Sequence, residues 1–463
     1  MMGTFQFMKE KWKSKMKSKY KNLLLFIGLF FLFFTFYRFK PSILSMDEVW
    51  NYGFAYNIRN GLIPYRDFNM ILTPLYPYTL SLFILIFENN FIMEIIFNCL
   101  ILAFISFILI KNIGKKGLFF IPILICIGSC CYNILSLLLF LIFLYINNSK
   151  YKDNQYLIGF IVSLMLLTKQ TTGGLILIAS FLFSKKKKDY LTGFLPLCIV
   201  FLSYLFFTNS LYNFFNYCLF GMFNFTTGNS FSGIDYTIIL FIISFILLIY
   251  LLIKKQFKSQ ELIYIFLFQI IAFPLFDYSH IFISLLPFLS YLFELKNINK
   301  IIYKIRLYLV TFIVVMTLVV DIRTICIDSN MYSNNMSFLN RIFIYTNMDT
   351  LVYNLKEEID NNYVDYTIYH INTLAYLYKL ETNEKINKFD LSNKGNMGYN
   401  GEEKWIKEID ETCKNTKCLL ILDHYKDINT QISMKINNYV IDNYKFEKNI
   451  DLYDLYTNKT DET

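Results

Sequence analysis

Two adjacent carboxylates, Asp47 and Glu48, stand in the segment SMDEVW shortly after the first long apolar run of the chain. An acidic side chain at a membrane surface is costly unless it is used. A carboxylate in a water-poor place can take a proton from a hydroxyl group, which is general-base chemistry. Asp47 and Glu48 are therefore candidate site residues, and Glu48 is a candidate for substrate binding.

Further along the chain, Lys169 and Gln170 separate two apolar runs, and Asp277 and His280 separate another pair. An isolated lysine on the side of a membrane that disfavours basic residues needs a reason, such as a phosphate partner. A histidine beside an aspartate can be oriented as a base. Plainer interpretations stay open, with Lys169 extending to the interface and His280 completing a loop.

The first polar loop also carries charged and aromatic residues in the segment GLIPYRDFNM. The spacing from Glu48 to Asn60 predicts a short amphipathic helix in the interface, ended by Gly61 and Pro64. Residues of these types also serve as ordinary interface anchors. The candidate substrate-binding residues of this loop are Arg59, Tyr65, Arg66 and Asp67.

A membrane protein must position these residues, because 55% of the 463 residues are hydrophobic and only 17% are charged. One soluble core of this length could not bury so much apolar surface. The pattern predicts a polytopic α-helical membrane protein with about 11 transmembrane helices and interfacial helices in the first outer loop. The expected spans are 22–38, 91–110, 117–131, 132–147, 156–168, 171–184, 190–208, 236–253, 261–276, 279–294 and 303–321.

The basic residues decide the orientation, because they are retained on the cytoplasmic side. If the run 70–87 lies in the outer interface, 23 lysines and arginines fall inside and five outside. If that run spans, the seven N-terminal lysines are separated from the other sixteen. The interfacial placement predicts a cytoplasmic N-terminus (1–21), a membrane core (22–321) with a first outer loop at about 39–90, and an extracytoplasmic domain (325–463).

The C-terminal region alternates predicted helices, at 347–360 and 402–413, with predicted strands, at 364–369 and 418–423. This alternation is typical of an α/β domain. No Gly-rich phosphate loop follows a strand, so we expect no nucleotide site. Cys413 and Cys418 could pair if the domain lies outside the cytoplasm, and the sequence leaves this open.

The formal charge of +9 does not indicate nucleic-acid binding, since the lysines stand in short blocks beside apolar runs. The nine cysteines show no metal-ligand spacing. We therefore expect a multi-pass protein of the plasma membrane, in contact with membrane lipid, without nucleic acid, metal or cofactor.

The order of these features resembles the GT-C superfamily of membrane glycosyltransferases, which includes protein O-mannosyltransferases, aminoarabinose transferases and bacterial envelope enzymes that use polyprenyl-phosphate sugars. The resemblance covers about residues 22–320. It rests on the Asp47-Glu48 pair, on the PYRDF segment at 64–68, on TPLY at 73–76, on LTKQT at 167–171 and, loosely, on Pro274 with Asp277 and His280.

The resemblance implies transfer of a sugar from a polyprenyl-phosphate donor to an envelope glycan, lipid or protein at the outer face, with inversion at the anomeric carbon. It implies that Asp47 is the general base. Arg59 or Arg66 would keep this carboxylate ionised, and Lys169 or Arg66 would stabilise the leaving phosphate. It also implies that no metal is required.

The chain departs from the mannosyl relatives at Thr73-Pro74-Leu75, where they carry a His-Pro-Pro-Leu-like segment, and at Glu94, where they carry a basic residue. The donor sugar and the phosphate contacts are therefore open. A transporter or flippase of lipid-linked sugars is an alternative, although it should place ionisable residues at mid-bilayer. A non-catalytic envelope-assembly protein is another.

Overall fold

The structure is a computed structural model, and the elements that it describes form a helical bundle followed by a small mixed α/β domain. The described residues are 2–39, 46–87, 92–128, 130–221, 236–254, 259–272, 277–295, 300–328, 348–370, 398, 401–423, 434–451 and 453–458.

The bundle is made of apolar helices, and within these described ranges five segments are long and apolar enough to cross a membrane by length and composition. These are Tyr20–Arg38, Ile92–Ile127, Cys131–Asn148, Lys187–Phe207 and Thr237–Lys254. Large apolar side chains also cover the outside of the bundle, such as Leu182 at 66% and Phe207 at 82% exposure. A surface of this kind suits lipid as its solvent, so the chain is a helical membrane protein.

The helices of the bundle follow one another with short connections. They are α1 (Met2–Phe39), α2 (Met46–Arg59), α3 (Leu75–Ile86), α4 (Ile92–Ile113), η1 (Gly114–Phe120), α5 (Ile121–Ile127), α6 (Cys131–Asn148), α7 (Gln155–Thr168), α8 (Gln170–Phe183), α9 (Lys187–Phe207), α10 (Leu211–Phe215), η2 (Asn216–Phe220), α12 (Tyr236–Lys254), α13 (Ser259–Phe268), η3 (Gln269–Ala272), α14 (Tyr278–Glu294) and α15 (Lys300–Asp328).

A glycine turns the chain back on itself after α4. Gly114 has a φ of 67°, a left-handed conformation that ends a helix at little cost for glycine. Gly117 then packs against the last turns of α4, since a Cβ at this position would lie 2.7 Å from the Ile110 backbone nitrogen. The long segment Ile92–Ile127 therefore consists of two helical pieces joined by this turn, and the separate spans 91–110 and 117–131 stay a prediction.

The first polar loop closes one end of the bundle with two short helices, α2 and α3. Helix α3 has 12 residues, which is about 18 Å and shorter than the hydrocarbon core of about 30 Å. Its Tyr76 and Phe83 both contact Phe97 near the start of α4. The run 70–87 therefore lies beside the beginning of α4, and its placement in the interface stays a prediction.

The C-terminal domain has a four-stranded sheet of order β1-β2-β4-β3, in which β1 and β2 are parallel and the other pairs are antiparallel. The expected strand 418–423 is present as β2, and the strand expected at 364–369 is β1, shifted toward the C-terminus. Strands β3 and β4 form a hairpin that the sequence analysis did not predict. The elements are α17 (Met348–Asn362), β1 (Thr367–His370), α19 (Gly401–Cys413), β2 (Cys418–Asp423), α20 (Met434–Asn443), β3 (Lys445–Ile450) and β4 (Tyr453–Thr457).

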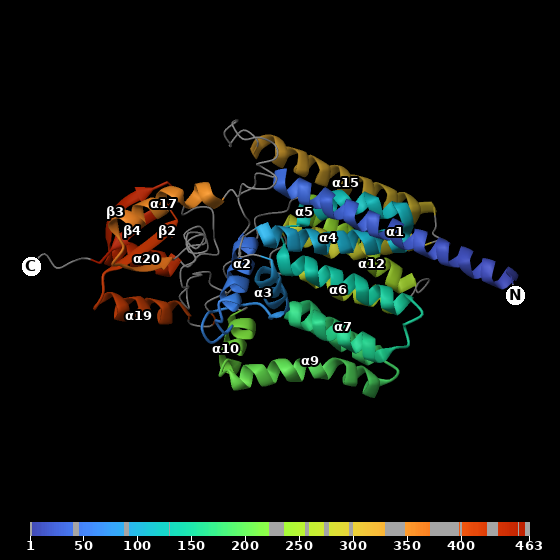
Figure 1. Ribbon diagram of the computed structural model, residues 1–463, viewed down its shortest axis with the longest axis horizontal. Coiled ribbons are helices and arrows are strands. Elements are labelled where there is room, and N and C mark those ends of the chain that lie inside the picture. The colour runs from blue at the N-terminus through green and yellow to red at the C-terminus, as the bar shows by residue number, and fades with distance from the viewer. Residues whose placement is uncertain are drawn as a thin grey trace, which may run out of the picture.

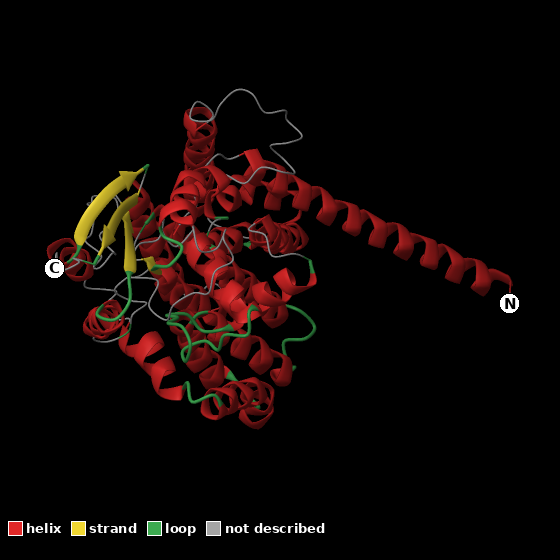
Figure 2. Cartoon of the chain, turned by 60° about the vertical axis from the view of Figure 1, so that its left-hand side comes forward, coloured by secondary structure: helices red, strands yellow, loops and turns green. Residues whose placement is uncertain are grey.

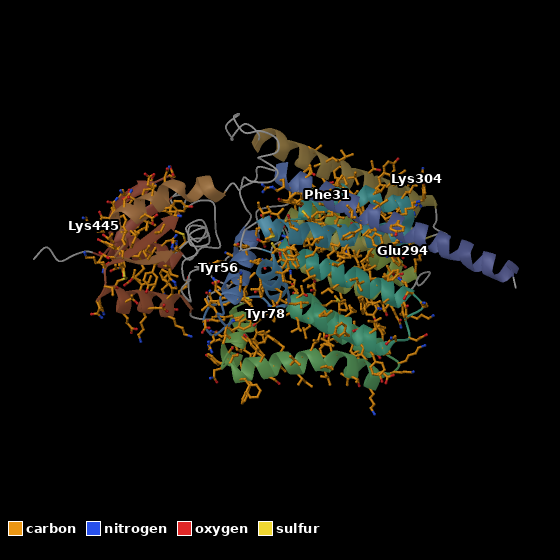
Figure 3. All side chains as sticks on the ribbon, in the orientation of Figure 1. Phe31, Tyr56, Tyr78, Glu294, Lys304 and Lys445 are labelled. Carbon is orange, nitrogen blue, oxygen red and sulfur yellow. A yellow bond between two sulfur atoms is a disulfide. The ribbon has the colours of Figure 1, made fainter. Side chains whose placement is uncertain are left out.

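The C-terminal domain and the chain's N-terminus lie at opposite ends of the bundle (Figure 1). We call the end that faces this domain, with α2, α3 and α10, the domain end. The opposite end is the basic end, from which the N-terminal part of α1 with its seven lysines projects (Figure 2). Tyr56 and Tyr78 mark the domain end, and Glu294 and Lys304 mark the basic end (Figure 3).

Helices α7 and α9 pack closely because each presents a glycine to the backbone of the other. A Cβ at Gly159 would lie 2.2 Å from the Tyr190 carbonyl oxygen, and one at Gly193 would lie 2.1 Å from that of Tyr156. Small residues allow such close approach between membrane helices.

Substitution of Gly159 by alanine is expected to lower the thermal stability of the protein, because the added methyl group overpacks this contact at a cost of about 1–3 kcal/mol. The matched control is Gly174→Ala on α8, where a Cβ meets nothing within 4 Å. Thermal unfolding of both variants in detergent measures the difference. Equal midpoints for the two variants would contradict the proposed packing.

Candidate functional site

Three segments that are far apart in the sequence meet in a chain of hydrogen bonds at the domain end. Lys169 Nζ donates to Asn133 Oδ1 over 2.7 Å. Asn133 Nδ2 lies 3.2 Å from His280 Nε2, and His280 Nδ1 lies 2.7 Å from Asp277 Oδ2. The structure therefore brings together three residues that the sequence proposed, Lys169, Asp277 and His280, through an asparagine that it did not.

The donors and acceptors in this series of hydrogen bonds fit together when the His280 imidazole is neutral. Asp277 can only accept when ionised, so His280 Nδ1 carries the proton and donates to it. The other ring nitrogen, Nε2, then accepts from the Asn133 amide, whose oxygen is left to accept from the Lys169 ammonium. Each member fixes the orientation of the next, which we infer from the hydrogen-bond geometry.

Local structure places each of these side chains. Lys169 is an extended residue, with φ of −148° and ψ of 110°, between the end of α7 and the start of α8. Gly173 allows α8 to lie close to α7, since a Cβ there would be 2.4 Å from the Leu166 Cα. Asp277 is the N-cap of α14, where its side chain accepts from the backbone nitrogen of His280 over 2.9 Å.

The Lys169 side chain is half-buried. Its ammonium lies 5.4 Å from the ring centroid of Tyr132, within the range of a cation–π interaction. His280, by contrast, is buried, with a side chain only 7% exposed. The Lys169 ammonium is thus the more accessible end of the series of hydrogen bonds, and the His280 imidazole is the more buried part.

Gln170 joins this region to the first polar loop. Its Nε2 donates to the carbonyl oxygens of Ile71, over 3.3 Å, and of Cys218, over 3.1 Å. The adjacent residues Lys169 and Gln170 therefore bind different partners. Lys169 binds Asn133, and Gln170 binds the first polar loop and η2.

The PYRDF segment is a self-contained turn. Arg66 and Asp67 form a bidentate ion pair at 2.7 and 2.9 Å, and Asp67 also accepts from the Ile63 backbone nitrogen over 2.7 Å. Tyr65 is fully buried, has a φ of 67°, and donates to the Leu72 carbonyl oxygen over 2.7 Å. Tyr65 and Asp67 thus hold the loop's shape, while Arg66 is 45% exposed.

Helix α2 carries the Asp47-Glu48 pair in its first turn and Arg59 in its last. The Asp47 side chain lies outside the described residues. Glu48 is 9% exposed and lies close enough to Cys99 and Tyr37 to interact with them electrostatically.

Arg59 is not brought to Asp47, because the continuous helix α2 separates their Cα atoms by about 18 Å. Its Nε is buried without a hydrogen-bond partner among the residues that the structure describes.

A buried acidic residue lies near these hydrogen bonds, and the sequence did not predict it as a site residue. Glu94, in the first turn of α4, is 0% exposed. Its Oε1 lies 3.3 Å from the Tyr76 hydroxyl and 3.4 Å from Cys131 Sγ, two residues before Asn133. The Tyr76 hydroxyl also donates to Asn98 over 2.7 Å. The available signal was an acid inside an otherwise apolar run, which is rare without a role.

Searches against protein-family models, curated proteins and solved structures found no match to the chain. Within the described ranges, no three His, Cys, Asp or Glu side chains are grouped so that they could hold a metal ion. The site is therefore interpreted from its own geometry.

The pH dependence of stability tests the Asp277–His280 contact. Burial raises the pKa of Asp277, but the hydrogen bonds that its carboxylate accepts from the His280 ring and from the backbone nitrogens of His280 and Ser279 outweigh this effect and leave that pKa below its usual value. A carboxyl group with a lowered pKa stabilises the fold above its unfolded pKa of about 3.9, and this contribution is lost as the pH falls through the folded value.

Asp277→Asn keeps an N-cap acceptor but removes the charge. We expect the variant to melt below wild type at pH 6–7, with a gap that narrows below about pH 4. Thermal midpoints in detergent across this range measure the gap. A gap that is independent of pH would show that the charge is not what His280 binds.

Proposed function

We propose that the chain is a membrane glycosyltransferase that transfers a sugar from a polyprenyl-phosphate donor to an acceptor of the cell envelope. The observation that carries the proposal is the Lys169 ammonium, fixed by Asn133 at 2.7 Å at the domain end. A cation held in place before the reaction is suited to a phosphate group that gains charge as it leaves.

The proposal includes eleven membrane spans with the domain end outside the cytoplasm. The spans are α1, α4, η1 with α5, α6, α7, α8, α9, α12, α13 with η3, α14 and α15. The basic residues support this orientation, because 23 of those in the N-terminus and loops fall on the opposite side. The disulfide between Cys413 and Cys418 also supports it, since disulfides persist in oxidising compartments.

The leaving group is the first half of the proposed chemistry. The bond between the anomeric carbon and the phosphate oxygen breaks, and its electron pair leaves with the polyprenyl phosphate. Lys169 receives the negative charge that builds up on this oxygen, so it stabilises the transition state more than the ground state. Asn133, His280 and Asp277 act as positioning residues, because they hold the ammonium without touching the substrate.

The nucleophile is the second half. Asp47 accepts the proton of the acceptor's hydroxyl group as the acceptor oxygen bonds to the anomeric carbon from the opposite side, which inverts this centre. Helix α2 places Asp47 at the domain end, where the acceptor arrives from outside. Glu48, Arg59, Arg66, Asp67, Tyr65 and Gln170 complete the proposed substrate site, either by contact or by shaping the loop.

A single substitution tests the base. Asp47→Asn should lower sugar transfer by about 10²–10⁴-fold, because an amide cannot accept the proton. Mass spectrometry of envelope glycans, in cells that lack their own copy and carry the variant, measures the transfer. Asp153→Asn, on an exposed turn at the basic end, is the matched control.

Transfer by Asp47→Asn at the wild-type rate, with equal protein levels, would contradict the role of Asp47. Glycans that are unchanged in cells lacking the protein would contradict the proposed function as a whole.

A further inference from the structure

A cavity of about 350 Å³ lies at the basic end of the bundle, away from the site described above. Four helices line it, namely the ends of α4, α6 and α14 and the start of α13. Its volume lies near the lower limit of pockets that bind small molecules, about 300 Å³. The cavity therefore has room for a small polar group rather than for a sugar on a lipid.

The lining of the cavity attracts a cation. Two acidic residues, Glu261 and Glu294, face one basic residue, Lys111, which leaves a formal charge of minus one. The C-terminal ends of α6 and α14 add to it, because the last carbonyl groups of a helix carry a partial negative charge. Glu294 stands in the final turn of α14 and belongs to this lining.

Hydrogen bonds hold this lining in place. Asn148 Nδ2 donates to Glu261 Oε1 over 2.7 Å, and Glu261 is only 8% exposed. Lys111 Nζ donates to Asn22 of α1 over 2.7 Å, so its ammonium stands at the rim beside α1. The acidic side chains thus lie deeper than the basic one.

Exposed basic and apolar residues stand at the same end of the bundle as the cavity. Lys115, Lys116, Lys150 and Lys152 follow directly on α4 and α6 and are exposed. Leu118 and Phe119 of η1 are also exposed, at 45% and 56%. Basic residues at a membrane surface attract lipid phosphate, and exposed apolar side chains contact acyl chains.

We propose that this cavity binds the head group of an aminophospholipid. The primary ammonium enters between Glu261 and Glu294, the phosphate remains at the rim with Lys111, and the acyl chains lie along the apolar surface outside. A primary ammonium carries hydrogen-bond donors that match carboxylate oxygens. A trimethylammonium group carries the same charge without donors, so it fits less well.

Native mass spectrometry of the purified full chain in detergent tests the proposal. We expect phosphatidylethanolamine to bind at least tenfold more tightly than phosphatidylcholine with the same acyl chains. Equal binding of the two lipids overturns the proposal, and this comparison needs no variant.

Variants locate the site. Glu294→Gln, at a half-buried position, and Glu261→Gln should each remove the preference for phosphatidylethanolamine, whereas Asp153→Asn at the same end should keep it. The melting temperature of each variant shows whether it folds. If the Glu261→Gln variant does not fold, the Glu294→Gln variant alone decides the outcome. Retention of the preference in a folded Glu294→Gln variant overturns the proposal.

A third arm separates the lipid from its free head group. Glycerophosphoethanolamine has the same ammonium and phosphate but no acyl chains. The proposal expects it to compete only at concentrations at least tenfold above those of the lipid. Competition at equal concentration overturns the assignment to a lipid.

Discussion

An ammonium group at the end of an apolar bundle needs polar partners, because a charge without them is costly to bury. Lys169 meets this need through Asn133, and Asn133 is held in turn by His280 and Asp277. These contacts link the α7–α8 junction to α6 and α14. Four helix ends thus meet where one cation is satisfied, namely the end of α7 and the starts of α6, α8 and α14, and the proposed phosphate site is a consequence of the same arrangement.

The sequence located much of this site but not its contacts. The lysine distribution placed Lys169, Asp277 and His280 on one side, because the positive-inside rule needs only the order of the spans. The choice of Asn133 as the link between them depends on helix packing, which periodicity does not specify. The sequence singled out Glu94 only by comparison with the mannosyltransferases that the chain resembles, because its partner Cys131 comes from another helix.

Local structure accounts for other differences. The role of the PYRDF turn in substrate binding stays a prediction, and the sequence did not specify that Tyr65 is buried or that Arg66 pairs with the adjacent Asp67. Strand β3 was missed because KFEKNI is polar and mostly exposed, and its pairing with β4 is a tertiary feature. The separation of Arg59 from Asp47 follows from the helix that the spacing from Glu48 to Asn60 predicts, because α2 runs unbroken from Met46 to Arg59.

The most direct test of the central claim is a structure of the protein bound to a polyprenyl monophosphate. We expect the phosphate to lie at the domain end, within hydrogen-bond distance of Lys169 Nζ, with Asn133 still bound to this lysine. Phosphate density at the basic end, or density at the domain end without contact to Lys169, would contradict the claim.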